Sequence, residues 1–103
     1  MSWQFEIKHK AQHAYDIIDK RTGNRVKTGV SGGKIRKDGK SYRADQQVRK
    51  WNKEAGGDYY ESTITHHEPA RPNARSNILE YERKRSAELR KAGELDEQKH
   101  QRP

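Results

Sequence analysis

Strand-forming residues gather in two neighbouring stretches near the start of the chain. Residues 14–19 and 25–31 are both rich in strand formers, and residues 20–24 between them supply the polar side chains and the glycine of a turn. Two short strands around such a turn form a β-hairpin. The pattern therefore predicts an antiparallel hairpin over residues 14–31.

The residues ahead of the hairpin allow two interpretations. Trp3, Phe5 and Ile7 alternate with polar residues, as they would in a half-buried strand, but the same stretch could be a connecting arm. A chain of 103 residues has room for one domain. We therefore assign residues 1–12 to an N-terminal arm or connecting strand, and residues 13–103 to the domain itself.

Apolar residues return at helical spacing after a loop. Residues 32–41 hold glycines among lysines, which predicts a loop, and Ser41 is suited to cap a helix that follows. Behind it, one face of the predicted helix collects the apolar residues Ala44, Val48, Trp51 and Ala55. The pair Gly56-Gly57 then ends the helix.

The second half of the chain predicts one more strand and one long helix. Residues 58–66 hold several β-prone side chains, and the prolines in residues 68–73 predict a loop. The long helix runs from about Ala74 to Ala92, and a polar, irregular tail follows over residues 94–103. This order predicts an α+β fold, in which a small antiparallel sheet, the hairpin plus a third strand, packs with two to three helices.

The long helix carries a glutamate on its apolar side. At about 100° per residue, one arc of this helix collects Ile78, Leu79, Arg85, Ser86 and Leu89. Glu82 lies in the middle of that arc, whereas Glu80 points nearly the opposite way. A buried carboxylate is costly without a partner. Glu82 therefore either forms an ion pair with an arginine such as Arg85 or Arg43, or serves as a metal ligand or catalytic acid–base group.

The charge of the chain points to a polyanionic partner. Lys and Arg number 23 against 15 Asp and Glu, which gives a net charge of +8, and such an excess attracts nucleic acid. Only 28% of residues are hydrophobic, so the core is thin, but the aromatic residues favour a folded domain over a disordered basic chain. A binding module without catalytic activity, or one that meets an acidic protein, would carry the same charge.

Several classes of protein are disfavoured by what the sequence lacks. The chain has no cysteine, which rules out disulfides and thiolate metal sites. No apolar run approaches the roughly 20 residues of a spanning helix, and no signal-peptide pattern opens the chain. We therefore expect no membrane partner.

Two tripeptides of the predicted hairpin resemble a known nuclease family. His13-Ala14-Tyr15 and Lys27-Thr28-Gly29 have the layout of the two tripeptides of the GIY-YIG nuclease superfamily, which lie on adjacent strands. That family places an arginine on the next helix and, on a later helix, a glutamate that holds one divalent metal ion. Arg43 and Glu82 match these two positions. Lys27 stands where the family usually has its second tyrosine.

Three short runs, residues 27–33, 41–43 and 99–103, also resemble the C-terminal toxin domains of polymorphic bacterial toxins. This resemblance implies a monomeric nuclease domain that is secreted or delivered as part of a larger toxin. It would act on DNA or RNA in the cytoplasm of a target cell, and an acidic cognate immunity protein would neutralise it.

The resemblance assigns a role to each candidate residue. Glu82 would hold the divalent ion, which we expect to be Mg²⁺, and Arg43 would contact the phosphate. Tyr15 would position or deprotonate a water molecule with help from the charge of Lys27. In a metal-independent ribonuclease, by contrast, His66, His67 or His100 would act as acid and base. The side chains expected to contact the nucleic-acid backbone are Lys34, Arg36, Lys37, Lys40 and Arg49.

Overall fold

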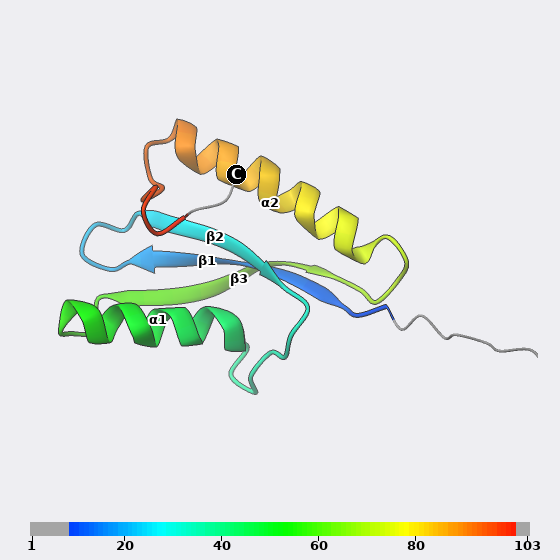
Figure 1. The fold of residues 1–103 in the computed structure, drawn as a ribbon, viewed down its shortest axis with the longest axis horizontal. Coiled ribbons are helices and arrows are strands. Elements are labelled where there is room, and N and C mark those ends of the chain that lie inside the picture. The colour runs from blue at the N-terminus through cyan, green and yellow to red at the C-terminus, as the bar shows by residue number, and fades with distance from the viewer. Residues whose placement is uncertain (1–8, 101–103) are drawn as a thin grey trace, which may run out of the picture.

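A computed structural model describes residues 9–100 of the chain. In this range the elements, in chain order, are β1 (Gln12–Asp19), β2 (Arg25–Ser31), α1 (Tyr42–Ala55), β3 (Tyr60–Glu68) and α2 (Ala74–Lys91). The strands form one antiparallel sheet in the order β2-β1-β3, and α1 and α2 lie on its two sides (Figure 1). The predicted α+β fold is confirmed. Trp3, Phe5 and Ile7 lie outside the described residues.

The hairpin forms where the strand pattern predicts it. Its turn is closed by a 2.9 Å hydrogen bond from the backbone N–H of Asp19 to the carbonyl of Asn24. In the register of the two strands, Tyr15 is paired with Gly29 and Ile17 with Lys27. A bulge follows Ile17, so Val26 is an extra residue on β2.

Helix α1 begins and ends at the predicted capping residues. The Ser41 hydroxyl accepts a 3.3 Å hydrogen bond from the N–H of Ala44, and Gly56 adopts the left-handed conformation with φ 77°, which glycine reaches without steric cost. Val48 is buried and Trp51 half-buried, as predicted. Ala55 is exposed, contrary to the prediction, because it is the last residue of the helix.

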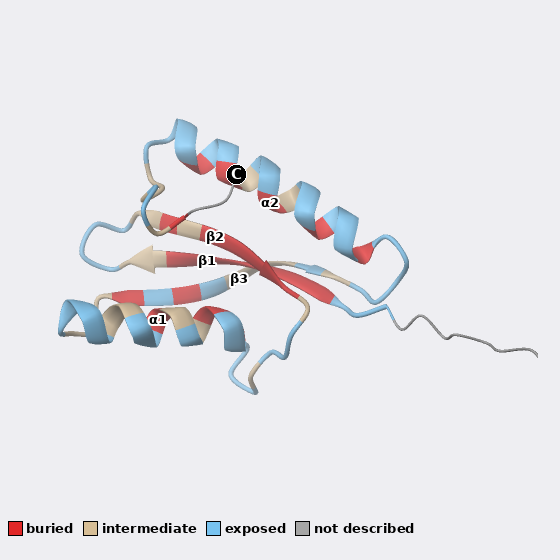
Figure 2. Ribbon diagram, viewed as in Figure 1, coloured by how far each residue is buried: buried red, intermediate tan, exposed pale blue. Residues whose placement is uncertain are grey.

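The buried side of α2 is confirmed for all but one of its predicted apolar residues. The buried residues form a row with spacings close to one helical turn: Ala74, Ile78, Glu82, Ser86 and Leu89. Figure 2 shows this row facing the sheet. Leu79 is 38% exposed, so its predicted burial is wrong, because it lies about 100° around the helix from Ile78.

Alternate residues of β1 face different helices. Tyr15 and Ile17 belong to an apolar cluster on the α1 side of the sheet, whose other buried members are Val26, Ala44, Val48 and Tyr60. A smaller cluster on the α2 side is formed by Ala14, Val30 and Ile78. Within residues 9–100, no helix is both long and apolar enough to span a membrane.

The tail after α2 has no helix or strand over residues 94–100, as predicted, but it packs against β2 (Figure 1). We call residues 94–100 the C-terminal turn. Its backbone joins the edge of the sheet through a 3.0 Å hydrogen bond from the N–H of Asp96 to the carbonyl of Val26. Glu94 binds Arg25 at 3.0 Å, and His100 is 1% exposed.

Candidate functional site at the edge of the sheet

The phenol of Tyr15 lies across β2. A Cβ atom added at Gly29, the residue paired with Tyr15, would lie 2.6 Å from the Tyr15 hydroxyl oxygen. Because real Cβ atoms do not approach other heavy atoms so closely, this position requires glycine. The strand β2 is at the edge of the sheet, so the ring of Tyr15 extends from the central strand to that edge.

Helix α1 supplies the groups nearest to this phenol. The Tyr15 hydroxyl donates a hydrogen bond of 3.4 Å to the side-chain oxygen of Gln47. Arg43, one helical turn earlier, is exposed, and its positive charge opposes the rise in the pKa of Tyr15 that burial causes. Gln47 was not predicted from the sequence: its spacing of four from Arg43 places both on one side of the helix, but it does not show that this side meets Tyr15.

Helix α2 brings Glu82 to the same phenol from the other side of the sheet. Glu82 is 6% exposed, and its negative charge raises the pKa of Tyr15. Arg85, one of the arginines suggested as its ion-pair partner, binds Asp16 of β1 at 2.8 Å. Arg43 of α1 and Glu82 of α2 therefore both lie within electrostatic range of the Tyr15 phenol of β1.

Burial decides the protonation state of Tyr15 in the free protein. Removal from water raises the pKa of the phenol above its ordinary value of 10.0, and this outweighs the opposing effect of Arg43. Tyr15 is therefore protonated at neutral pH. Tyr15 is 1% exposed and its hydroxyl already donates to Gln47, so the phenol reaches a phosphate or a water molecule only if this contact opens, and it is not a ready general base.

Lys27 and His100 form a second group along the same edge. The ammonium nitrogen of Lys27 lies 5.8 Å from the centre of the Trp51 ring. Burial lowers the pKa of His100, with smaller contributions from the positive charges of Arg90 and Lys27. Neither ring nitrogen of His100 meets a described partner in good hydrogen-bond geometry, and a weak contact to the backbone of Thr28 only partly offsets the lowering of its pKa. At 1% exposure, this imidazole does not reach solvent, so an acid–base role requires the C-terminal turn to open.

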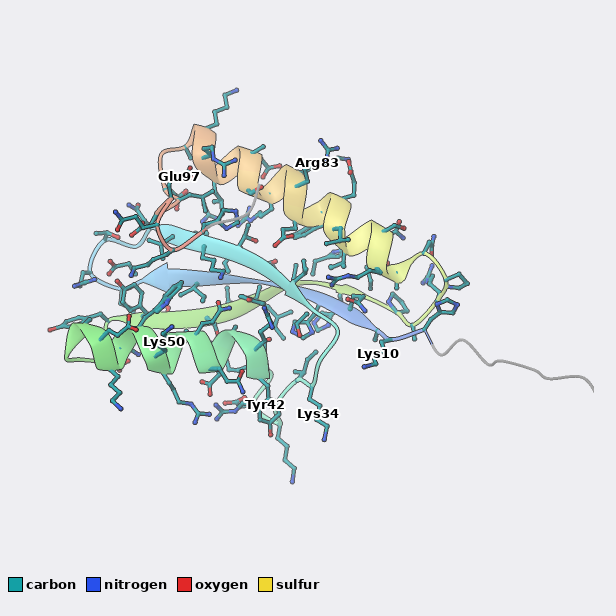
Figure 3. All side chains as sticks on the ribbon, in the orientation of Figure 1. Lys10, Lys34, Tyr42, Lys50, Arg83 and Glu97 are labelled. Carbon is teal, nitrogen blue, oxygen red and sulfur yellow. The ribbon has the colours of Figure 1, made fainter. Side chains whose placement is uncertain are left out.

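Some of the residues predicted to contact phosphate form ion pairs or hydrogen bonds within the protein. Arg36 binds Asp45 at 2.9 Å, Arg49 binds the same carboxylate, and Lys40 donates to the carbonyl of Ser62. Lys34 and Lys37 are exposed, and Lys34 extends away from the loop (Figure 3). Arg49 is exposed as well, despite its ion pair.

The histidines of β3 have local partners. The ring of His66 stacks on Tyr81 with centroids 4.6 Å apart, and its Nε2 lies 2.9 Å from a carboxylate oxygen of Glu68. His67 is exposed and lies near enough to His13 to lower the pKa of that buried histidine, after the larger effect of burial. The predicted role of His66 and His67 in a ribonuclease stays a prediction.

Glu82 is the one carboxylate among the described side chains that act on Tyr15, so the site offers a single candidate protein ligand for a metal ion. Within residues 9–100, no three or more His, Cys, Asp or Glu side chains are grouped to hold a metal. Mg²⁺ commonly keeps several water ligands and is held by one or two carboxylates together with substrate phosphate. Glu82 supplies one such carboxylate, so a Mg²⁺ that binds together with the substrate agrees with this donor set.

Comparisons with protein-family models, curated proteins and solved structures found no match to this chain.

Proposed function

We propose that this chain is an endonuclease domain that cleaves phosphodiester bonds with the help of a divalent metal ion. The observation that carries this proposal is the convergence of Tyr15, Arg43 and Glu82 at the β2 edge. Their side chains come from β1, α1 and α2, and both Arg43 and Glu82 act on the Tyr15 phenol. The net charge of +8 suits a polyanionic substrate.

Each of the three residues has a task in hydrolysis. The guanidinium of Arg43 offers a planar pair of donors to the phosphate oxygens. The protonated phenol of Tyr15 orients the attacking water, whose oxygen forms the new bond to phosphorus while the bond to the leaving oxygen breaks. The proton of the attacking water passes to solvent, and the leaving oxygen takes a proton from solvent. Glu82 holds the metal ion, which when bound supplies positive charge to the phosphate.

We infer that the nuclease domain is part of a bacterial toxin, because residues 27–33 and 41–43 resemble toxin domains of bacteria. Its target would then be the nucleic acid of a competing bacterium. An acidic immunity protein would bind this cationic domain, whose net charge is +8. Charge complementarity of this kind favours fast association.

The test of the proposed function is cleavage of plasmid DNA and total tRNA by the purified protein, with Mg²⁺ and with a chelator. We expect loss of at least one substrate in Mg²⁺ and none in the chelator. Cleavage of RNA that persists in the chelator would replace this mechanism with one in which a histidine acts on the 2′-hydroxyl. Intact DNA and RNA under both conditions would contradict nuclease activity on these substrates.

A further inference from the structure

A cleft of about 420 Å³ opens beside the candidate site. It lies between α1, β2 and the C-terminal turn, and each of these elements contributes a lysine: Lys50, Lys27 and Lys99. Figure 3 marks Lys50 on α1 and Glu97 in the C-terminal turn, the two elements on either side of this cleft. One carboxylate, Glu54, also lines it. Because three lysines outnumber this single carboxylate, the lining carries a net positive charge.

The wall of the cleft at Trp51 favours an anion over a nucleobase. The ammonium nitrogens of Lys99 and Lys27 lie 5.0 Å and 5.8 Å from the centre of the Trp51 ring, where the ring attracts cations. Because lysines already lie over the ring, it is a poor platform for stacking a base. The cleft instead presents ammonium groups held near an aromatic ring.

The cleft is directly linked to the reacting groups. Gln47 lines it and accepts the hydrogen bond from the Tyr15 hydroxyl. A nucleic-acid strand whose reacting phosphate lies at Tyr15 and Arg43 would therefore continue past Gln47 into the cleft.

The C-terminal turn holds Lys99 in position before any ligand binds. The N–H groups of Lys99 and His100 donate to the carbonyl of Asp96 at 3.0 Å and 2.7 Å, and the N–H of Asp96 is bonded to β2. The buried ring of His100 anchors the end of this turn. A group ordered in advance loses less entropy on binding.

We propose that this cleft binds a second phosphate of the substrate strand, adjacent to the one that reacts, through Lys50 and Lys99. This proposal rests on the proposed nuclease function in taking nucleic acid as the ligand. It makes the C-terminal turn part of the substrate site, with the lysine charges compensating a phosphate that is not cleaved. Lys50 and Lys99 are then positioning residues for the strand.

The first experiment measures binding of a labelled 12-nucleotide single strand, as DNA and as RNA, in chelator over a series of salt concentrations. Each phosphate contact to a single strand contributes about 0.7 to the salt slope. Lys50→Ala and Lys99→Ala should each lower the slope by about 0.7 and, at 0.1 M salt, raise Kd about fivefold. A change with both probes supports a phosphate site for either nucleic acid, and a change with one probe alone identifies the nucleic acid that binds.

Lys84→Ala and Lys91→Ala are matched controls, because both remove a lysine from the exposed side of α2. We expect them to leave Kd and the salt slope within error of the wild type. If the two controls weaken binding as much as Lys50→Ala and Lys99→Ala, the cleft is not a site and binding follows total charge alone.

Trp51 gives a second readout within the cleft. The chain has two tryptophans, so Trp3→Phe leaves Trp51 as the sole tryptophan. Saturation with the oligonucleotide should change Trp51 fluorescence, and the change should be lost in the Lys50→Ala, Lys99→Ala double variant. Binding that leaves the fluorescence of Trp51 unaltered would overturn the proposal, because the strand would then lie elsewhere.

The two proposals fail in different ways. If the wild type binds nucleic acid through Lys50 and Lys99 but never cleaves it, the phosphate site in the cleft is supported and the proposed nuclease activity is contradicted. If the wild type cleaves, and the lysine variants keep its KM and its salt slope, the nuclease assignment stands and the cleft is overturned.

Discussion

The two sides of the sheet differ in chemistry although one strand, β1, lies at the centre of both. Among residues 9–100, the α1 side holds six buried residues in one apolar cluster, with Trp51 and Tyr59 packed against it. Within the same range, the α2 side has three buried residues in its cluster, and beside them lie the buried polar side chains of Asp16, Glu82 and Ser86. Stability thus comes mainly from the α1 side, and the α2 side can carry a buried carboxylate for chemistry.

This difference follows from the alternation of β1. Tyr15 and Ile17 bring large apolar areas to α1, where burial contributes about 25 cal/mol per Å². Ala14 and Asp16 face α2 and contribute little apolar area. Asp16 is 1% exposed and depends on Arg85 for charge compensation.

Among changes that distinguish the two sides of the sheet, Arg85→Ala should have the largest effect on the free energy of unfolding. It leaves the Asp16 carboxylate buried without this partner, which costs about 3–5 kcal/mol of unfolding free energy. Denaturant unfolding measures the change. Adding Asp16→Asn to this variant should recover part of the loss, because the buried charge is gone; strictly additive losses would contradict the pairing.

A matched change on the α1 side is Val48→Ala, which opens a small cavity in the apolar cluster. We expect a loss of about 1–2 kcal/mol that Asp16→Asn does not recover. If Asp16→Asn compensates both variants equally, the two sides of the sheet are not energetically distinct.

The next prediction concerns the loss of stability and activity when the Tyr15 ring can no longer lie over Gly29 of the edge strand β2. Gly29→Ala places a Cβ 2.6 Å from the Tyr15 hydroxyl, which should cost about 1–3 kcal/mol and displace the phenol, so activity falls as well. In a Tyr15→Ala background the same change should cost less than about 1 kcal/mol. Equal costs in the two backgrounds would show that the phenol does not lie over Gly29.

The smallest effect is a pH dependence of stability from His100. Burial holds the pKa of His100 below its ordinary value of 6.5 in the folded protein, so the unfolded chain binds the extra proton as pH falls below about 6.5. Stability from this residue is complete above that pH and is lost as pH falls toward the folded pKa, by at most about 1.4 kcal/mol per pH unit.

His100→Leu should flatten this loss in unfolding experiments between pH 7.5 and 5.5, and it should not lower stability at pH 7.5. It removes ring nitrogens that are buried and meet no described partner in good hydrogen-bond geometry, and such groups carry a desolvation penalty. An unchanged pH profile would contradict the role of His100 in acid sensitivity.

Much of the fold could be predicted because its signals are local. The hairpin follows from strand formers around residues 20–24, and the limits of α1 follow from Ser41 and Gly56. The inward position of Glu82 follows from helical periodicity alone. Each of these needs only neighbours within a few residues.

The features that were missed depend on contacts between distant parts of the chain. Asp16 and Arg85 pair across 69 positions, and the packing of the C-terminal turn on β2 joins Asp96 to Val26. Gln47 joins the site only because Tyr15 crosses Gly29 at the sheet edge. No local pattern encodes which helix residue meets which strand residue, so these contacts could not be derived from spacing.

Cleavage by Glu82→Gln, compared with Glu80→Gln, tests whether the carboxylate of Glu82 is needed for metal-dependent cleavage. Both variants remove one carboxylate from α2, but Glu82 is buried at the site, whereas Glu80 is exposed and bound to Arg83. In Mg²⁺ we expect a loss of roughly 10²–10³-fold or more for Glu82→Gln and wild-type rates for Glu80→Gln, with both variants folded. A folded Glu82→Gln variant that cleaves at the wild-type rate would show that Glu82 does not hold a catalytic metal ion.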